Sequence, residues 1–131
     1  MKRSKIIFLL SLCCLLLAGC SDNSPQAVAK AYCEAMFNAE FKKAKSLCTP
    51  QTKEAVDLAA GLTKKKEIER MKAAEKEFYI VDYTIDDEKE TAKVMIKVTL
   101  KEKGEDQPEV MDQKVELEKV DGKWKVSLKL K

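Results

Sequence analysis

The chain has 131 residues, of which 36% are charged and 45% hydrophobic, and it contains no histidine. The missing histidine excludes catalytic triads with an imidazole base and metal sites built on imidazole. The net charge of +3 comes from three basic residues within 1–19, and the remaining 22 basic residues balance 22 acidic ones. We therefore expect no nucleic-acid partner, no cofactor and no metal site.

Residues 1–19 have the composition of a signal peptide. Lys2, Arg3 and Lys5 precede an apolar run from Ile6 to Leu17 that is broken only by Ser11. At 1.5 Å per residue the run spans roughly 18 Å of helix, whereas the hydrocarbon core of a bilayer is roughly 30 Å thick. This length indicates a cleaved signal peptide, and the alternative is an uncleaved N-terminal anchor.

The run ends in Leu17-Ala18-Gly19-Cys20, which resembles the lipobox of bacterial lipoproteins. The resemblance implies cleavage before Cys20 and diacylation of its thiol, which would give a stable membrane anchor through two acyl chains. The alternative is ordinary secretory cleavage with a free Cys20. We expect the protein on the extracytoplasmic side of the cell membrane or outer membrane, with residues 20–24 as a short tether.

Residues 25–131 are expected to form a single α+β domain that begins with helices. Ser24-Pro25 and Thr49-Pro50 each combine an N-cap residue with proline at the first helical position. The predicted helices are 25–38, 40–47, 50–60 and 64–76, with Gly61 as the interruption and Thr63 as the cap before the last of them.

From residue 77 the apolar period changes from 3.6 to 2. The predicted strands are 77–85, 92–101, 111–120 and 124–130, and they form an antiparallel meander. Asp121-Gly122 is typical of a two-residue hairpin turn. This turn predicts three cross-strand pairs: Leu117 with Val126, Val115 with Leu128, and Glu118 with Lys125.

Strand 77–85 carries apolar residues on both faces. Strict alternation places Tyr79 and Tyr83 on one face, together with Val81 and Ile85, and Asp82 on the other face, together with Phe78, Ile80 and Thr84. Asp82 would then be the one acid that shares a strand face with large apolar side chains.

Four segments together resemble small bacterial lipoproteins that carry a domain of unknown function of the nuclear-transport-factor-like (cystatin-like) superfamily. They are residues 24–32, 41–44, 49–50 and 121–126. The resemblance implies N-terminal helices on one face of a curved four-stranded antiparallel sheet, forming a cone that holds a small ligand in some relatives. It implies a cavity lined by Tyr32, Tyr79, Tyr83, Asp82 and Trp124; the alternative is that these aromatic residues belong to the core.

The resulting expectation is a non-enzymatic binding or interaction module that recognises a small ligand or an envelope protein. One alternative is an enzyme that uses the lone carboxylate of Asp82 with a tyrosine partner. Another is a structural lipoprotein without a pocket. Cys33 and Cys48 form either a disulfide, since both leave the cytoplasm, or two buried thiols.

Overall fold

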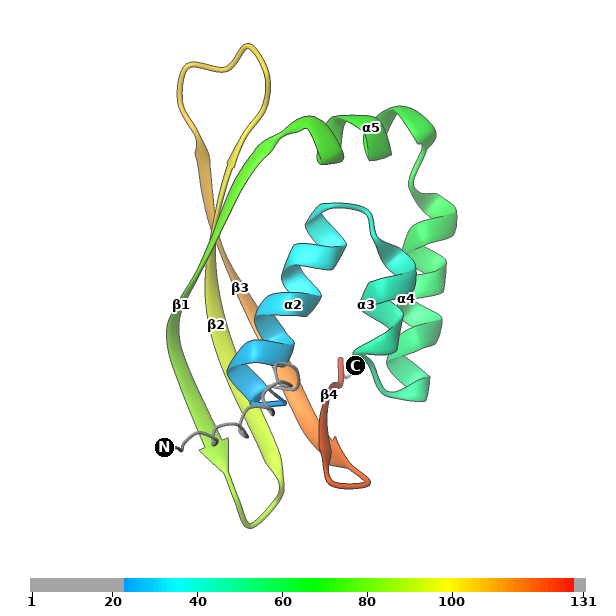
Figure 1. Cartoon of the computed structure of the whole chain (residues 1–131), viewed down its shortest axis with the longest axis vertical. Coiled ribbons are helices and arrows are strands. Elements are labelled where there is room, and N and C mark those ends of the chain that lie inside the picture. Colours follow the sequence, from blue (N-terminus) through cyan, green and yellow to red (C-terminus); the bar gives the residue numbers. More distant parts are fainter. Residues whose placement is uncertain (1–22, 129–131) are drawn as a thin grey trace, which may run out of the picture.

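The computed structural model describes residues 23–128, and these form an α+β domain with helices first and a sheet second (Figure 1). The predicted signal peptide, Cys20 and the end of the last predicted strand lie outside the described residues. The helices are α2 (Pro25–Phe37), α3 (Phe41–Ser46), α4 (Pro50–Leu62) and α5 (Lys65–Ala73). The strands are β1 (Glu75–Asp86), β2 (Thr91–Lys101), β3 (Glu109–Val120) and β4 (Lys123–Val126).

Both predicted helix starts are confirmed. The Ser24 hydroxyl accepts a hydrogen bond from Ala27 N–H at 3.1 Å, and the Thr49 hydroxyl accepts one from Thr52 N–H at 3.3 Å. Each cap satisfies a backbone donor that has no partner within its helix.

The boundaries between α4, α5 and β1 differ from the prediction. α4 continues through Gly61 to Leu62, and Thr63 ends α4 because its hydroxyl donates to the Ala59 carbonyl at 2.7 Å. The first turn of α5 is instead closed by Glu67, whose carboxylate accepts from Lys64 N–H at 3.3 Å. α5 ends at Ala73, before the predicted Lys76, because pairing with β2 already begins at Glu75.

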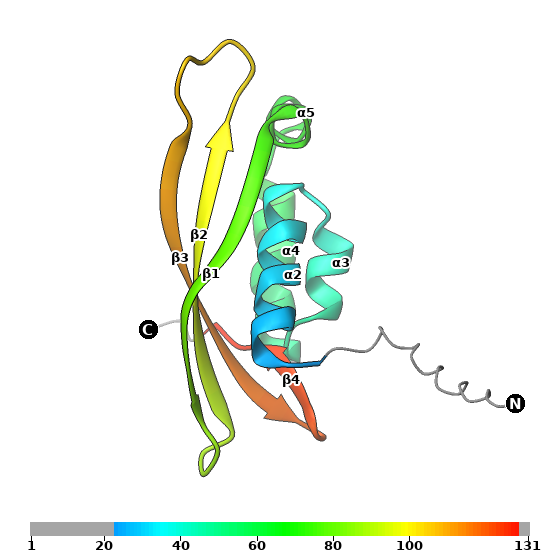
Figure 2. The ribbon, with the colours of Figure 1, turned by 60° about the vertical axis from the view of Figure 1, so that its left-hand side comes forward.

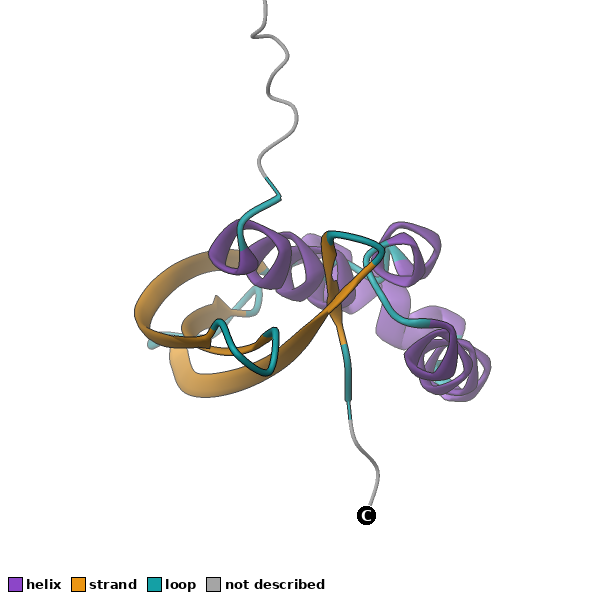
Figure 3. Cartoon of the chain, turned by 90° about the horizontal axis from the view of Figure 1, so that it is seen from below, coloured by secondary structure: helices purple, strands orange, loops and turns teal. Residues whose placement is uncertain are grey.

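The sheet is antiparallel throughout, in the order β1-β2-β3-β4. The helices lie on one side of it, with α2 nearest to the strands (Figure 2), and the strands are visibly curved when seen from below (Figure 3). Val94, Ile96 and Val98 of β2 are completely buried against this helical side. Their alternation with exposed or half-buried residues confirms the clearest predicted strand.

The predicted hairpin at Asp121-Gly122 is confirmed. Asp121 and Gly122 have φ values of 53° and 79°, as a type I′ turn requires, and the ladder pairs Leu117 with Val126 and Glu118 with Lys125. The last hydrogen bond between the two segments runs from Ser127 N–H to the Glu116 carbonyl at 2.8 Å, and the predicted pair of Val115 with Leu128 is not formed. Leu128 N–H instead donates to the Thr52 hydroxyl oxygen of α4 at 3.0 Å.

Candidate functional site at the outer edge of strand β1

The five residues expected to line a cavity do not come together. Tyr32 and Trp124 are core residues, 8% and 7% exposed. For these two residues the alternative prediction, that they belong to the core, is confirmed. Tyr79 and Tyr83 are half exposed on β1, and Asp82 is exposed beside them. A surface cleft of about 470 Å³ lies elsewhere, between the β1–β2 hairpin and β3, and none of the five residues lines it.

A β-bulge explains why the predicted faces of β1 were wrong. Ile80 pairs with Ile96 and Asp82 with Met95, so Val81 is an extra residue without its own partner. The insertion reverses the alternation for the second half of the strand. Tyr83 lies opposite the buried Val94 on the helical side, together with Phe78, Ile80 and Ile85.

Asp82 consequently lies on the sheet face that turns away from the helices. It is cross-strand from Met95, on the same face as Tyr79, whose cross-strand partner is Lys97. One carboxylate oxygen accepts the N–H of Tyr83 at 2.8 Å. The hydrophobic neighbours that alternation assigned to Asp82 are therefore on the opposite face.

Cys33 and Cys48 are free thiols in the core, without a disulfide between them. Burial raises the pKa of Cys33 to about 12 and that of Cys48 to about 11. Burial also raises the pKa of Tyr32 to about 12, with a smaller contribution from the charges that the two thiols would carry. Thiols held neutral in this way are poor nucleophiles, so this cluster belongs to the packing of the core.

Within residues 23–128 no group of three or more Cys, Asp or Glu side chains could hold a metal ion. In the same range no helix is both long and apolar enough to cross a membrane.

The two outer edges of the sheet differ in how their backbone groups are satisfied. At the β4 edge, Val126 N–H donates to the Leu47 carbonyl at 2.8 Å, and the Val126 carbonyl accepts from Thr49 N–H at 3.0 Å. For β1, among the described residues, no backbone hydrogen bond joins the strand to any segment other than β2. Apart from Tyr83 N–H, which the Asp82 carboxylate accepts, the outward backbone groups of this twelve-residue strand are thus available to a partner.

Apolar side chains are concentrated at this open edge. The described residues expose eight large hydrophobic side chains, and five of these are on β1. They are Tyr79 (50% exposed), Ile80 (38%), Val81 (49%), Tyr83 (49%) and Ile85 (41%). The presence of apolar residues on both faces of strand 77–85 was the signal in the sequence, but the family resemblance led to the expectation that residues of this strand line a cavity.

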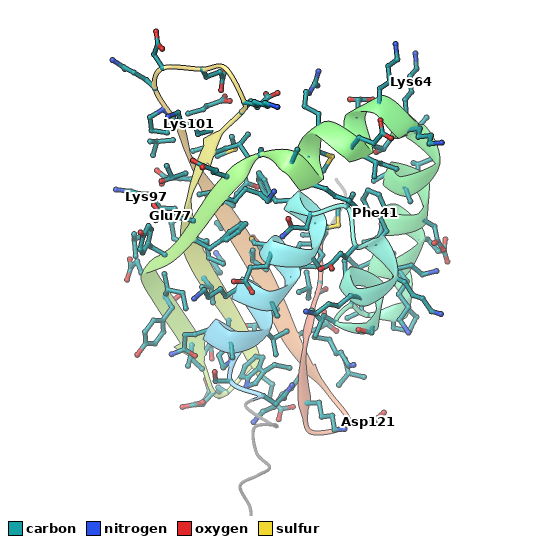
Figure 4. The ribbon with its side chains drawn as sticks, turned by 45° about the horizontal axis from the view of Figure 1, so that its top comes forward. Phe41, Lys64, Glu77, Lys97, Lys101 and Asp121 are labelled. Carbon is teal, nitrogen blue, oxygen red and sulfur yellow. The ribbon has the colours of Figure 1, made fainter. Side chains whose placement is uncertain are left out.

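The face of β1 that turns away from the helices carries the four carboxylates of the strand, with Tyr79 and Thr84 between them. Glu75, Glu77, Asp82 and Asp86 lie on it or continue its row, and none forms an ion pair within the described part of the chain. The only lysine of β1 is Lys76, whose ammonium donates to the carbonyls of Met71 and Ala74 at the end of α5. Glu77 is seen beside Lys97 and Lys101 on the strand side of the molecule (Figure 4).

We use the name β1 edge for this surface. It comprises an apolar row on the helical side (Ile80, Tyr83 and Ile85) and an acidic row on the other side (Glu77, Asp82 and Asp86).

Compared with known proteins, the chain matches no family model, no curated protein and no solved structure at a significant level.

Proposed function

We propose that this chain is a lipoprotein of the cell envelope, anchored through a diacylated Cys20, whose domain binds a partner and does not catalyse a reaction. The β1 edge is the observation that carries the binding role. An exposed strand edge with a cluster of apolar side chains is a liability for a protein that works alone, and it is useful to one that binds other molecules.

The start of the domain supports a short connection to the membrane. Asn23 holds the backbone of Trp124 at two points: its carbonyl oxygen accepts from Trp124 N–H at 2.7 Å, and its amide donates to the Trp124 carbonyl at 3.5 Å. Asn23 is three residues after Cys20, and three extended residues span about 10 Å. An acylated Cys20 would therefore keep this end of the domain close to the bilayer.

The environment of the titratable groups supports binding over catalysis. General acid–base catalysis near neutral pH requires a group whose pKa lies in that range, and a carboxylate reaches it mainly by burial. Asp82 is exposed, so it lacks the buried environment of such a catalytic group. The strongly shifted groups, Tyr32, Cys33 and Cys48, are enclosed in the core.

We include in the proposal a relationship to the cone-shaped nuclear-transport-factor-like superfamily. Helices followed by a four-stranded antiparallel sheet support it, as does the curvature of the strands (Figure 3). In this protein the binding function would be at the β1 edge, because the residues expected to line the cone are either packed in the core or exposed on β1.

The anchor is tested by metabolic labelling with an alkyne analogue of palmitate in a bacterial host. We expect the wild-type chain to be labelled, to enter the detergent phase of Triton X-114, and to accumulate as a precursor when globomycin is added. Cys20→Ser should lose the label, and Cys33→Ala is the matched control that should keep it. Label retained by Cys20→Ser, or a wild-type chain in the aqueous phase, would contradict the proposal.

The binding site is tested by native mass spectrometry of the protein isolated from its own host. We expect no small molecule to remain bound, because the β1 edge fits an extended polymer and not an enclosed ligand. A retained small molecule would contradict the β1 edge as the binding site and would favour a cavity inside a cone.

A further inference from the structure

We propose that the β1 edge binds an extended polypeptide segment in which apolar residues alternate with lysine or arginine, added to the sheet as a fifth strand. This inference deepens the proposed binding function by naming the class of partner. It does not depend on the anchor at Cys20.

The backbone supplies the first argument. A strand added beside β1 would satisfy the outward N–H and C=O groups that have no partner among the described residues, and such main-chain bonds provide much of the affinity in strand addition. The β4 edge offers no such opportunity, because residues 47–49 already cover it.

The side chains determine which segment fits. Directly opposite residues of neighbouring strands share a face, so the two rows of the β1 edge act separately on the incoming strand. Side chains on the helical side would contact Ile80, Tyr83 and Ile85 and should be apolar. Side chains on the other side would face a row in which Tyr79 and Thr84 lie between Glu77, Asp82 and Asp86. Basic side chains should therefore recur on that side.

Strand β2 shows that this pattern pairs with β1. Its residues on the helical side, Val94, Ile96 and Val98, are apolar and buried, whereas Lys93, Lys97 and Lys101 alternate with apolar or polar residues on the other side. β2 pairs with β1 along nearly its whole length. A partner of similar pattern would place the acidic row of β1 between two basic rows.

A second copy of the chain fits less well. β1 carries four carboxylates against the single Lys76, so two β1 strands side by side would bring like charges together, which is destabilising. A membrane surface also fits less well. It can contact only one face of the strand, while exposed apolar side chains occur on both, and it leaves the backbone groups without partners in an apolar medium.

The test uses the full chain in mild detergent and a fluorescent peptide with the sequence of residues 93–101. The control peptide has the same composition with its lysines grouped at one end. Fluorescence anisotropy should show saturable binding of the alternating peptide, and the grouped peptide should bind at least about tenfold more weakly. Higher salt should weaken binding, because the acidic row is exposed.

Two sets of variants locate the site. The double variant Ile80→Lys, Tyr83→Lys changes the apolar row and should weaken binding at least about tenfold. Val110→Lys, at a 57% exposed position on β3, is the matched control and should change binding by less than about twofold. The pair Glu77→Gln, Asp82→Asn should weaken binding and reduce its dependence on salt.

Amide hydrogen exchange of the wild-type chain provides a second readout that needs no variant. The alternating peptide should slow exchange at outward amides of β1 and leave α4 unchanged. Unchanged β1 exchange, equal binding of the two peptides, or equal effects of the double variant and Val110→Lys would each overturn the proposal. So would a concentration-dependent dimer that the double variant abolishes, or displacement of the peptide by lipid vesicles.

The outcomes separate this inference from the anchor. A chain with an unmodified Cys20 that binds the alternating peptide would refute the lipid anchor and leave the inference standing. An acylated chain that binds the alternating and the grouped peptide equally well would refute the inference and leave the anchor standing.

Discussion

Raising the pH above 9 should weaken the fold, because two thiols must stay neutral in the core. Cys33 and Cys48 are 3% and 2% exposed. Burial raises the pKa of Cys33 from 9.0 to about 12 and that of Cys48 from 9.0 to about 11. Above pH 9 the thiols lose their protons in the unfolded chain, whereas the folded chain retains them up to about pH 11 for Cys48 and about pH 12 for Cys33. The stabilisation is therefore fully present below pH 9 and is lost as the pH rises through these folded-state pKa values.

The size of the effect follows from proton linkage. Each thiol that ionises only in the unfolded state lowers the free energy of unfolding by about 1.4 kcal/mol per pH unit. Two thiols together give at most about 2.7 kcal/mol per pH unit, and about 2.3 kcal/mol per unit between pH 9.5 and 10.5. The slope is lower in this range because ionisation in the unfolded chain is incomplete and Cys48 begins to ionise in the folded chain. A domain of this size has a total stability of about 5–15 kcal/mol, so the loss should be plain in a denaturation curve. Tyr32 adds to the slope only above its ordinary pKa of 10.0.

The assay is urea unfolding between pH 8.0 and 10.5 under reducing conditions, followed by the fluorescence of Trp124. This is the single tryptophan of the chain and it is buried. Cys33→Ala and Cys48→Ala should each show about half of the thiol-dependent slope. The double variant Cys33→Ala, Cys48→Ala reports the background slope from lysines and tyrosines. The wild-type chain and all three variants share this background.

A wild-type slope no steeper than that of the double variant would refute the reasoning. The same experiment without reductant tests the disulfide, because a bridge between Cys33 and Cys48 would remove both titrations. Wild-type protein would then have the slope of the double variant until reductant is added.

Three further changes test the fold by thermal or urea denaturation. Gly122→Val should cost about 1 kcal/mol or more, because Gly122 has a φ of 79° and a β-branched residue is strained there even though space is free; unchanged stability would contradict the type I′ turn. Thr52→Val should cost about 1–3 kcal/mol, because it removes the acceptor for Leu128 N–H; a loss below 0.5 kcal/mol, as is usual for a surface change, would exclude that role. Asn23→Ala should cost about 1–2 kcal/mol, since Trp124 N–H loses its acceptor, and an unshifted midpoint would show that Asn23 does not hold the start of the domain.

Local signals in the sequence predicted much of the fold. The caps at Ser24 and Thr49 and the turn at Asp121-Gly122 depend on contacts within three residues, and each is confirmed. The alternation in β2 is equally local, since a strand buried on one side repeats every second residue. These features allowed the class α+β and the antiparallel meander to be predicted before the structure.

Side-chain hydrogen bonds decided two of the boundaries that were predicted wrongly. Thr63 has the composition of an N-cap, but its hydroxyl bonds backward to Ala59 and ends α4. Leu128 continues an alternating pattern, but the Thr52 hydroxyl draws the chain toward α4. In both cases a side-chain hydrogen bond changed where a helix or strand ends. The spacing of apolar residues in the sequence cannot predict such a bond.

The candidate site was missed for a different reason. The bulge at Val81 involves no glycine and has no signature in the local sequence, yet one inserted residue reverses every later side chain of β1. Asp82 was therefore assigned to an apolar face that it does not occupy. Tyr83 and Ile85 were assigned away from Phe78, whereas they continue its row.

The same bulge gives the β1 edge its two different rows. With strict alternation, Asp82 would interrupt the apolar row of Phe78 and Ile80, and Tyr83 would follow Tyr79 on the face of Glu77. The extra residue realigns the second half of the strand, so that apolar side chains continue along the helical side, and the carboxylates share the other side with Tyr79 and Thr84. An incoming strand of strict alternation can then match the edge over its full length. The bulge interrupts the alternation in the sequence of β1. By doing so it positions the side chains of β1 so that an alternating partner strand fits.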